Sequence, residues 1–282
     1  MIEKKFKTKS NNSKNILRKI RYGLFDRNFR YLTSPFRALP KFIIVGSVRS
    51  GTTSLYYNIC EHPEIAPAAY DEIGFFDVNF NLGLNWYRSM FPLKSDKNIT
   101  GEDTPFYFWR EDAAKRIKKI LPDIKLIMIL RNPIDRAYSN YHLGVRGGTE
   151  KLSFEEAIEI EIETLEKIDI NKNNLVELCS KPRSYIIKSM YYEQMKIWTE
   201  NFSMKNIFVM NTENMSKNPN MELKKIFEFL NVSPFKITNP QNRKSAQYNI
   251  MKDSTREKLL EFFIPHNNKL YELIGQKFNW EK

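Results

Sequence analysis

The chain has 282 residues, 41% of them hydrophobic and 13% aromatic, which is enough to bury the core of one α/β domain and excludes a disordered chain. Its formal net charge is +12, but residues 1–31 hold ten Lys or Arg against Glu3 and Asp26, so they contribute +8 and the remainder only +4. We predict a basic N-terminal arm over residues 1–38, followed by a single domain over residues 39–282. The arm is either a solvated extension or a peripheral contact with an anionic membrane surface.

Three short apolar runs predict buried parallel strands, at residues 42–45, 126–130 and 207–210. Each run is followed by polar or glycine-containing residues and then by a helical pattern. Strands that alternate with helices are typical of a doubly wound sheet. We therefore expect an α/β fold of three layers, in which helices flank a central parallel sheet, with a P-loop-like turn after the first strand.

That first strand runs directly into a glycine-containing loop, Gly46-Ser47-Val48-Arg49-Ser50-Gly51-Thr52-Thr53-Ser54, and a helix is predicted over residues 52–60. Glycines let the backbone approach an anion, and the N–H groups at a helix start point towards it, so the pattern predicts a phosphate cradle. The two glycines have Walker A spacing, but Thr52 stands where that motif has lysine. The cation is instead Arg49, inside the loop. The alternative is an ordinary glycine turn between strand and helix.

A second candidate phosphate site follows the strand at residues 126–130. Arg131 stands at the carboxyl end of that strand, where open α/β sheets bind their ligands. Pro133 suits the first turn of a helix, and Ser139 then lies about two turns along it. A guanidinium and a hydroxyl can hold a phosphate together. The alternative is a capped helix without a ligand.

The two motifs together resemble those of sulfotransferases that use 3′-phosphoadenosine 5′-phosphosulfate (PAPS). Residues 49–53 resemble the loop that binds the 5′-phosphosulfate, and residues 131–139 resemble the 3′-phosphate signature. The resemblance implies transfer of a sulfuryl group from PAPS to a hydroxyl or amine, with no metal. It implies that the donor is bound by Arg49, Ser50, Gly51, Thr52, Thr53, Ser54, Arg131 and Ser139. Arg243 and Lys244, which stand where the family has a disulfide-bearing loop, are expected to close over the nucleotide.

On the acceptor side, residues 71–77 resemble the heparan-sulfate type of this family, in which an acidic residue precedes a Phe-Phe pair. By position Glu72 matches the catalytic base, and Arg49 would neutralise the departing phosphate during in-line transfer. Without the resemblance, Glu72 reads as a surface carboxylate. Heparan-type relatives usually have lysine where this chain has Asp103. The expected acceptor is a saccharide, glycolipid or small alcohol, with Trp86, Tyr87 and Trp109 as candidates to stack on sugar rings.

The later part of the chain predicts a capped helix, a loop, an irregular stretch and a last helix, over residues 153–167, 171–184, 234–249 and 254–263. Ser153 and Glu156 form the capping box of the first of these helices. The two cysteines, Cys60 and Cys179, are expected to be reduced thiols. No run of about 18 apolar residues and no signal peptide is present, so we expect a cytoplasmic protein, and we expect no nucleic-acid partner.

Two other functions fit parts of the pattern. A P-loop kinase or nucleotide hydrolase would share the glycine spacing, but Thr52 occupies its lysine position and the second phosphate site has no role in it. A non-catalytic protein that binds glycans or lipid surfaces would explain the basic arm. It predicts binding of PAPS without turnover.

Overall fold

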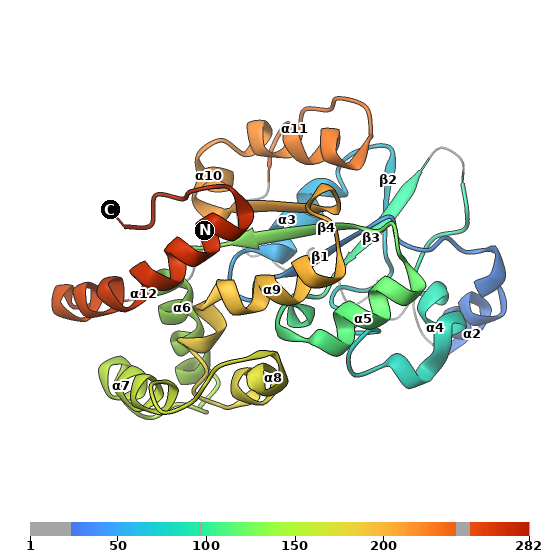
Figure 1. Ribbon diagram of the computed structural model, residues 1–282. Helices are drawn as coiled ribbons and strands as arrows, with labels where there is room; N and C mark the ends of the chain where they lie inside the picture. The colour runs from blue at the N-terminus through green and yellow to red at the C-terminus, as the bar shows by residue number, and fades with distance from the viewer. Residues whose placement is uncertain (1–23, 96–97, 241–248, 282) are drawn as a thin grey trace, which may run out of the picture.

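The computed structural model describes residues 24–95, 98–240 and 249–281, and its centre is a five-stranded parallel sheet in the order β2-β3-β1-β4-β5 (Figure 1). The strands are β1 (Phe42–Gly46), β2 (Ile65–Pro67), β3 (Ile99–Asp103), β4 (Lys125–Leu130) and β5 (Ile207–Asn211). The three predicted strands are confirmed as β1, β4 and β5, with bounds that differ by at most one residue. Because every pair is parallel, the carboxyl ends of all five strands meet at one edge of the sheet.

Alternate residues of the strands pack into two different cores. Phe42 and Ile44 of β1 belong to the core under α3 and α11, whereas Ile43 and Val45 belong to the larger core on the opposite face. All four side chains are fully buried. Strands with helices on both faces read as continuous apolar runs, which is why the pattern of β1 does not alternate with polar residues.

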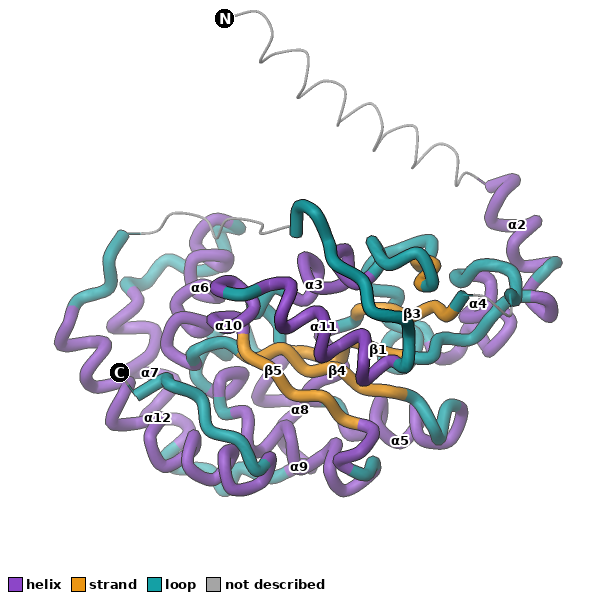
Figure 2. The backbone as a smooth tube through the Cα atoms, turned by 90° about the horizontal axis from the view of Figure 1, so that it is seen from above, coloured by secondary structure: helices purple, strands orange, loops and turns teal. Residues whose placement is uncertain are grey.

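The helices form the two outer layers of the predicted three-layer fold (Figure 1, Figure 2). They are α2 (Leu24–Leu32), α3 (Thr52–Ile59), α4 (Gly83–Ser89), α5 (Glu111–Ile120), α6 (Pro133–Arg146), α7 (Phe154–Leu165), α8 (Lys172–Ser180), α9 (Tyr191–Asn201), α10 (Thr212–Lys217), α11 (Pro219–Leu230) and α12 (Asp253–Ile274). Helices α3 and α11 pack together on one face, while α5, α9 and α12 form a continuous layer on the other.

Two of the predictions of secondary structure are wrong, one on the type of an element and one on the end of a helix. Residues 171–184 were expected to be a loop, but α8 occupies most of them, because Leu175, Leu178 and Cys179 bury one side of a helix that ends before Pro182. The last helix, α12, continues eleven residues beyond the predicted end at residue 263 and carries Pro265 inside it. Buried residues on both sides of the proline, such as Phe263 and Leu270, stabilise the continuation.

Other local predictions are confirmed. Helix α3 covers the predicted segment to within one residue. Helix α7 begins at the predicted capping box, in which Ser153 accepts from the Glu156 N–H and the Glu156 carboxylate accepts from the Ser153 N–H at 2.8 Å. Both cysteines are free thiols.

The described part of the basic arm lies against the loop after α4. Arg30 donates to the carbonyl oxygens of Ser89 and Phe91 at 2.7 and 3.0 Å, and Arg37 donates to that of Phe91 at 2.8 Å. Arg37 is buried, whereas Leu32 stays 77% exposed. Hydrogen bonds from Arg30 and Arg37 therefore attach this segment to the domain. The domain boundary at residue 38 stays a prediction.

Candidate active site

The loop after β1 has the backbone shape that an anion cradle requires. Gly51 is the N-cap of α3 with φ +91°, a conformation that glycine adopts without strain. Arg49 also has a positive φ, of 71°, so its side chain leaves the loop in an unusual direction. At Gly46 an added Cβ would lie 2.6 Å from the Phe108 side chain, so a larger residue does not fit there.

Hydroxyl groups hold the loop from within and from β5. Ser47 Oγ and Ser50 Oγ lie 2.6 Å apart, and both side chains are buried. Thr212, directly after β5, donates to the Ser50 carbonyl at 2.7 Å and also lies 3.0 Å from that of Leu130. The loop is thus fastened to the ends of β4 and β5, which fixes its amides at the carboxyl edge of the sheet. Among the predicted loop residues, Thr52 is buried, Thr53 and Ser54 are half-buried, and Gly51 is exposed.

The structure brings the two predicted phosphate sites into direct contact. Arg49 of the loop donates to Ser139 Oγ of α6 through Nε at 3.2 Å and through Nη2 at 3.1 Å. The two residues are 90 positions apart in the chain. A cation and a hydroxyl assigned to different phosphates therefore lie close enough to act on one ligand.

Arg131 directly follows β4, and hydrogen bonds hold the turn that it begins. The Tyr191 hydroxyl donates to the Arg131 carbonyl at 2.9 Å. Asn132 caps α6 by accepting from the Ile134 N–H at 3.0 Å, and its own N–H donates to Glu213 at 2.8 Å. Arg131 also lines a hollow of about 290 Å³, together with Asp135, Tyr138, Asn249, Ile250, Met251 and Arg256. This hollow lies beside α6, where the second phosphate site was predicted.

Arg136, on α6 between Arg131 and Ser139, holds the fold together rather than facing the site. It is fully buried, and it donates to Ser189 Oγ at 2.6 Å and to the Tyr185 carbonyl. The carboxylate of Glu161 on α7 holds the same segment from the other side by accepting from the N–H groups of residues 185, 186 and 187. Burial raises the pKa of Glu161 to about 7 although these hydrogen bonds favour its charged form.

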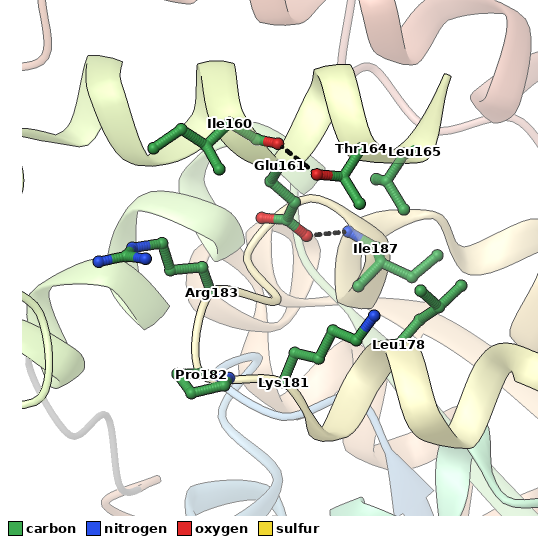
Figure 3. A pocket seen from close by; sticks show the side chains of 9 residues that line it. All are labelled: Ile160, Glu161, Thr164, Leu165, Leu178, Lys181, Pro182, Arg183 and Ile187. Carbon is green, nitrogen blue, oxygen red and sulfur yellow. Dashed lines mark hydrogen bonds between the residues drawn. The ribbon is translucent and has the colours of Figure 1, made fainter. Parts of the chain in front are cut away.

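Figure 3 shows the pocket that this segment closes between α7 and α8. The volume of the pocket is about 240 Å³. The Glu161 carboxylate points towards Ile187, and Lys181 and Arg183 line the pocket from the segment that follows α8. Arg183 pairs with the buried carboxylate of Glu150 at 3.0 Å. The pocket therefore lies on the side of α7 that faces α8.

Glu72 lies at the same sheet edge, next to the end of β3. Its N–H donates to the Asp103 carbonyl at 3.0 Å, and Asp103 pairs with Ile44 of β1, two residues before the loop. Glu72 has φ 51° and an exposed side chain, and burial of part of the carboxyl and the charge of Asp71 raise its pKa. Asp103 is 1% exposed, and neither of its carboxyl oxygens has a hydrogen-bond partner among the described residues. Burial and the neighbouring carboxylates raise its pKa to about 8.

Comparison with known proteins decides the family. The sulfotransferase domain matches residues 39–269 of this chain. The chain belongs to the sulfotransferase family. It is 26% identical to the membrane-associated sulfotransferase kil1 of Dictyostelium discoideum, over 86% of this chain and 67% of that protein. It is 28% identical to the human heparan sulfate glucosamine 3-O-sulfotransferase 5, over 94% of this chain and 81% of the relative. A sulfotransferase from Alicyclobacillus acidocaldarius has the same fold, with a TM-score of 0.70 and 27% identity over 87% of this chain and all of the other.

The sulfotransferase site differs from the sequence prediction in its aromatic residues. Tyr87 is fully buried and stacks on Phe75 at 4.4 Å between ring centroids, and Trp109 is 5% exposed beneath Lys188. Neither ring can stack on a sugar, and only Trp86 of the three candidates is partly accessible. Tyr70 and Phe106, which are 42% and 44% exposed, are the accessible rings of the segments that flank Glu72 and Asp103.

The sequence did not predict the residues that hold the two phosphate motifs of this sulfotransferase in place. Thr212, Tyr191 and Glu213 contact the two phosphate motifs from distant parts of the chain, and no spacing in the sequence signals them. The predicted nucleotide-closing residues Arg243 and Lys244 lie outside the described residues. Within the described ranges, no helix is long and apolar enough to cross a membrane and no group of acidic, His or Cys residues has the arrangement of a metal site.

Proposed function

We propose that this sulfotransferase uses PAPS as its donor and transfers the sulfuryl group to a hydroxyl of a saccharide acceptor. The observation that carries the donor is the contact between Arg49 and Ser139, which joins the phosphosulfate loop to the predicted 3′-phosphate helix. A donor with phosphates at both ends spans these motifs, whereas ATP offers nothing to the second one. The loop residues 50–54 supply amides and hydroxyls, and Arg131 supplies the second guanidinium.

The same arrangement supports in-line transfer with Glu72 as the base. A partly buried carboxyl with a raised pKa is a better proton acceptor for a hydroxyl than an ordinary surface carboxylate. The Arg49 guanidinium stabilises the negative charge that develops on the departing phosphate. The acceptor class rests on the heparan sulfate glucosamine 3-O-sulfotransferases among the relatives and on the exposed rings of Tyr70 and Phe106.

Calorimetric binding of 3′-phosphoadenosine 5′-phosphate, with ADP and ATP as controls, tests the donor. We expect the bisphosphate to bind most tightly and the binding to weaken at least tenfold in Arg131→Ala. Arg146→Ala is the matched control, because Arg146 is exposed in the last turn of α6, the helix that follows Arg131. Binding of ATP alone, and only with magnesium, would show that the donor is wrong and would favour the kinase or hydrolase.

Turnover of radiolabelled PAPS on a panel of oligosaccharides tests the reaction. Glu72→Gln keeps the shape of the side chain and removes the base, so we expect kcat to fall by a factor of about a hundred or more while binding of the bisphosphate is unchanged. Near-normal turnover in this variant would remove Glu72 from the mechanism. Binding without turnover on any acceptor would favour the non-catalytic alternative.

We also propose a cytoplasmic protein with a basic arm over residues 1–38 and a catalytic domain over residues 39–282. The arm would contact anionic membranes, because its sequence is rich in Lys and Arg and its described part exposes the apolar side chains of Phe29, Leu32 and Phe36. Co-sedimentation with vesicles of phosphatidylglycerol, compared with vesicles of phosphatidylcholine, tests this contact. Equal recovery on both vesicles, or none, would leave the arm as a solvated extension.

A further inference from the structure

The acceptor side of the candidate site carries an excess of negative charge. Asp71, Glu72 and Asp103 form a carboxyl cluster at the end of β3, where the Glu72 N–H donates to the Asp103 carbonyl at 3.0 Å. Burial first, and then the charges of Asp71 and Glu72, raise the pKa of Asp103. No ion pair to any of the three is found in residues 24–95, 98–240 and 249–281. The Tyr57 hydroxyl donates to the Asp71 carboxylate at 2.6 Å.

Asp103 sets this cluster apart from an ordinary acidic surface. Its carboxyl is 99% buried, and both oxygens are without a hydrogen-bond partner within the described structure. The titratable groups around it are Tyr56 and Cys60 of α3, Asp71 and Glu72 of the preceding loop, and Glu102 of its own strand. None of these is a cation. Among these described neighbours, an ionised Asp103 would therefore face only neutral or negative groups.

The neighbours also explain why the negative charge is directed at the acceptor side. Glu102 points into the other core, where the hydroxyls of Tyr87 and Thr104 donate to it at 2.6 and 2.8 Å. Asp71 and Glu72 are exposed. The cationic groups Arg49 and Arg131 belong to the donor side, after β1 and β4 respectively. The site is thus divided into a cationic half for the donor and an anionic half beside it.

We propose that the carboxyl cluster of Asp71, Glu72 and Asp103 selects a saccharide acceptor without carboxylate or sulfate groups on the reacting unit. This inference rests on the proposed saccharide acceptor and names its charge class. An anionic sugar would bring like charge to the cluster, and two charges about 6 Å apart repel measurably at the effective dielectric of a protein surface. We expect a preference of roughly tenfold or more, since about 1.4 kcal/mol corresponds to a factor of ten.

The preference has a pH dependence that a purely structural role would not produce. With a pKa of about 8, Asp103 is mostly protonated at neutral pH and becomes charged above it. Asp71 and Glu72 therefore cause the preference at pH 7, and Asp103 adds to it only as the pH rises through about 8. The discrimination against anionic acceptors should therefore increase as the pH rises from 7 to 9. The increase should be smaller in Asp103→Asn.

The test uses matched oligosaccharides with the full-length protein. A neutral chitin tetrasaccharide is compared with a tetrasaccharide of alternating N-acetylglucosamine and glucuronate, at pH 7 and pH 9, by sulfate transfer and by binding to the complex with the bisphosphate. We expect wild type to favour the neutral sugar. Asp71→Asn should lower the ratio of neutral-sugar to glucuronate-sugar transfer several-fold at both pH values, and Asp103→Asn should lower this ratio only at pH 9. Asp123→Asn is the control, because Asp123 is exposed at the opposite edge of the sheet.

Two results would overturn the inference, one from transfer and one from binding. Equal or better transfer to the glucuronate sugar by wild type would refute the charge selection, while sulfotransfer to saccharides would stand. If no sugar is sulfated although the bisphosphate binds, the saccharide acceptor is wrong, and the binding measurements decide the charge class. Equal binding of both sugars in that case, or no binding of either, counts against the cluster as a selective site.

Discussion

Replacing Asp103 by asparagine should change how the stability of this sulfotransferase depends on pH. Its carboxyl is buried without a partner, and its pKa rises from 3.8 to about 8 in the folded chain. Between about pH 5 and about pH 7 the folded chain therefore holds one more proton at this residue than the unfolded chain does. Stability from this group is complete below the unfolded pKa and is lost as the pH rises through the folded pKa.

The magnitude follows from the proton difference. One proton corresponds to about 1.4 kcal/mol of unfolding free energy per pH unit, so the group loses about 5 kcal/mol in all between pH 4 and pH 8. Asparagine has the same shape and does not ionise. The unfolding free energy of Asp103→Asn relative to wild type should therefore increase steadily across this interval and become constant above about pH 8.

Urea unfolding followed by circular dichroism at a series of pH values measures this difference. The absolute stability of Asp103→Asn is not decisive, because an amide in this place also lacks partners, and only the slope against pH carries the inference. Asp123→Asn makes the same chemical change at an exposed position and should give a difference that does not vary with pH. If the difference in unfolding free energy between Asp103→Asn and wild type also did not vary with pH, the Asp103 carboxyl would titrate normally in the folded chain. The predicted pH dependence of acceptor selection would then be wrong as well.

Three further substitutions test the fold. Gly101→Ala places a Cβ about 2.4 Å from the Phe42 ring, so we expect a loss of about 1–3 kcal/mol in chemical unfolding. Ser153→Ala removes the capping box of α7 and should cost about 1 kcal/mol in the same assay. Arg136→Met removes a fully buried guanidinium that holds residues 185–189, and we expect lower thermal stability and weaker bisphosphate binding together. Unchanged binding at a lowered melting temperature would separate Arg136 from the site.

Local rules in the sequence were sufficient for the parts of the site that follow strands directly. The loop at residues 46–54 and the turn at Arg131 each follow a buried apolar run. In a parallel sheet the carboxyl ends of such runs meet at one edge, so their proximity could be expected. The capping box of α7 was readable for the same reason, because both of its partners lie within one helical turn.

The helix α8 and the far half of α12 could not be assigned this way. Residues 172–180 are largely polar. The helix forms because Leu175, Leu178 and Cys179 pack into the core. Pro265 predicts a helix end, yet packing on both sides of it outweighs the lost backbone hydrogen bond. Local preference decided neither case, since the stabilising contacts come from distant residues.

The sequence by itself determined that two motifs resembling the phosphate-binding motifs of sulfotransferases stand at the ends of parallel strands, because each motif is a short run whose chemistry is local. Only the tertiary structure decided that Arg49 reaches Ser139, that Tyr87 and Trp109 belong to the core, and that Asp103 is buried beside Glu72 without a partner. Those properties depend on which faces of separate elements meet. The charge and burial of a side chain in the site are set by neighbours that the linear order does not name.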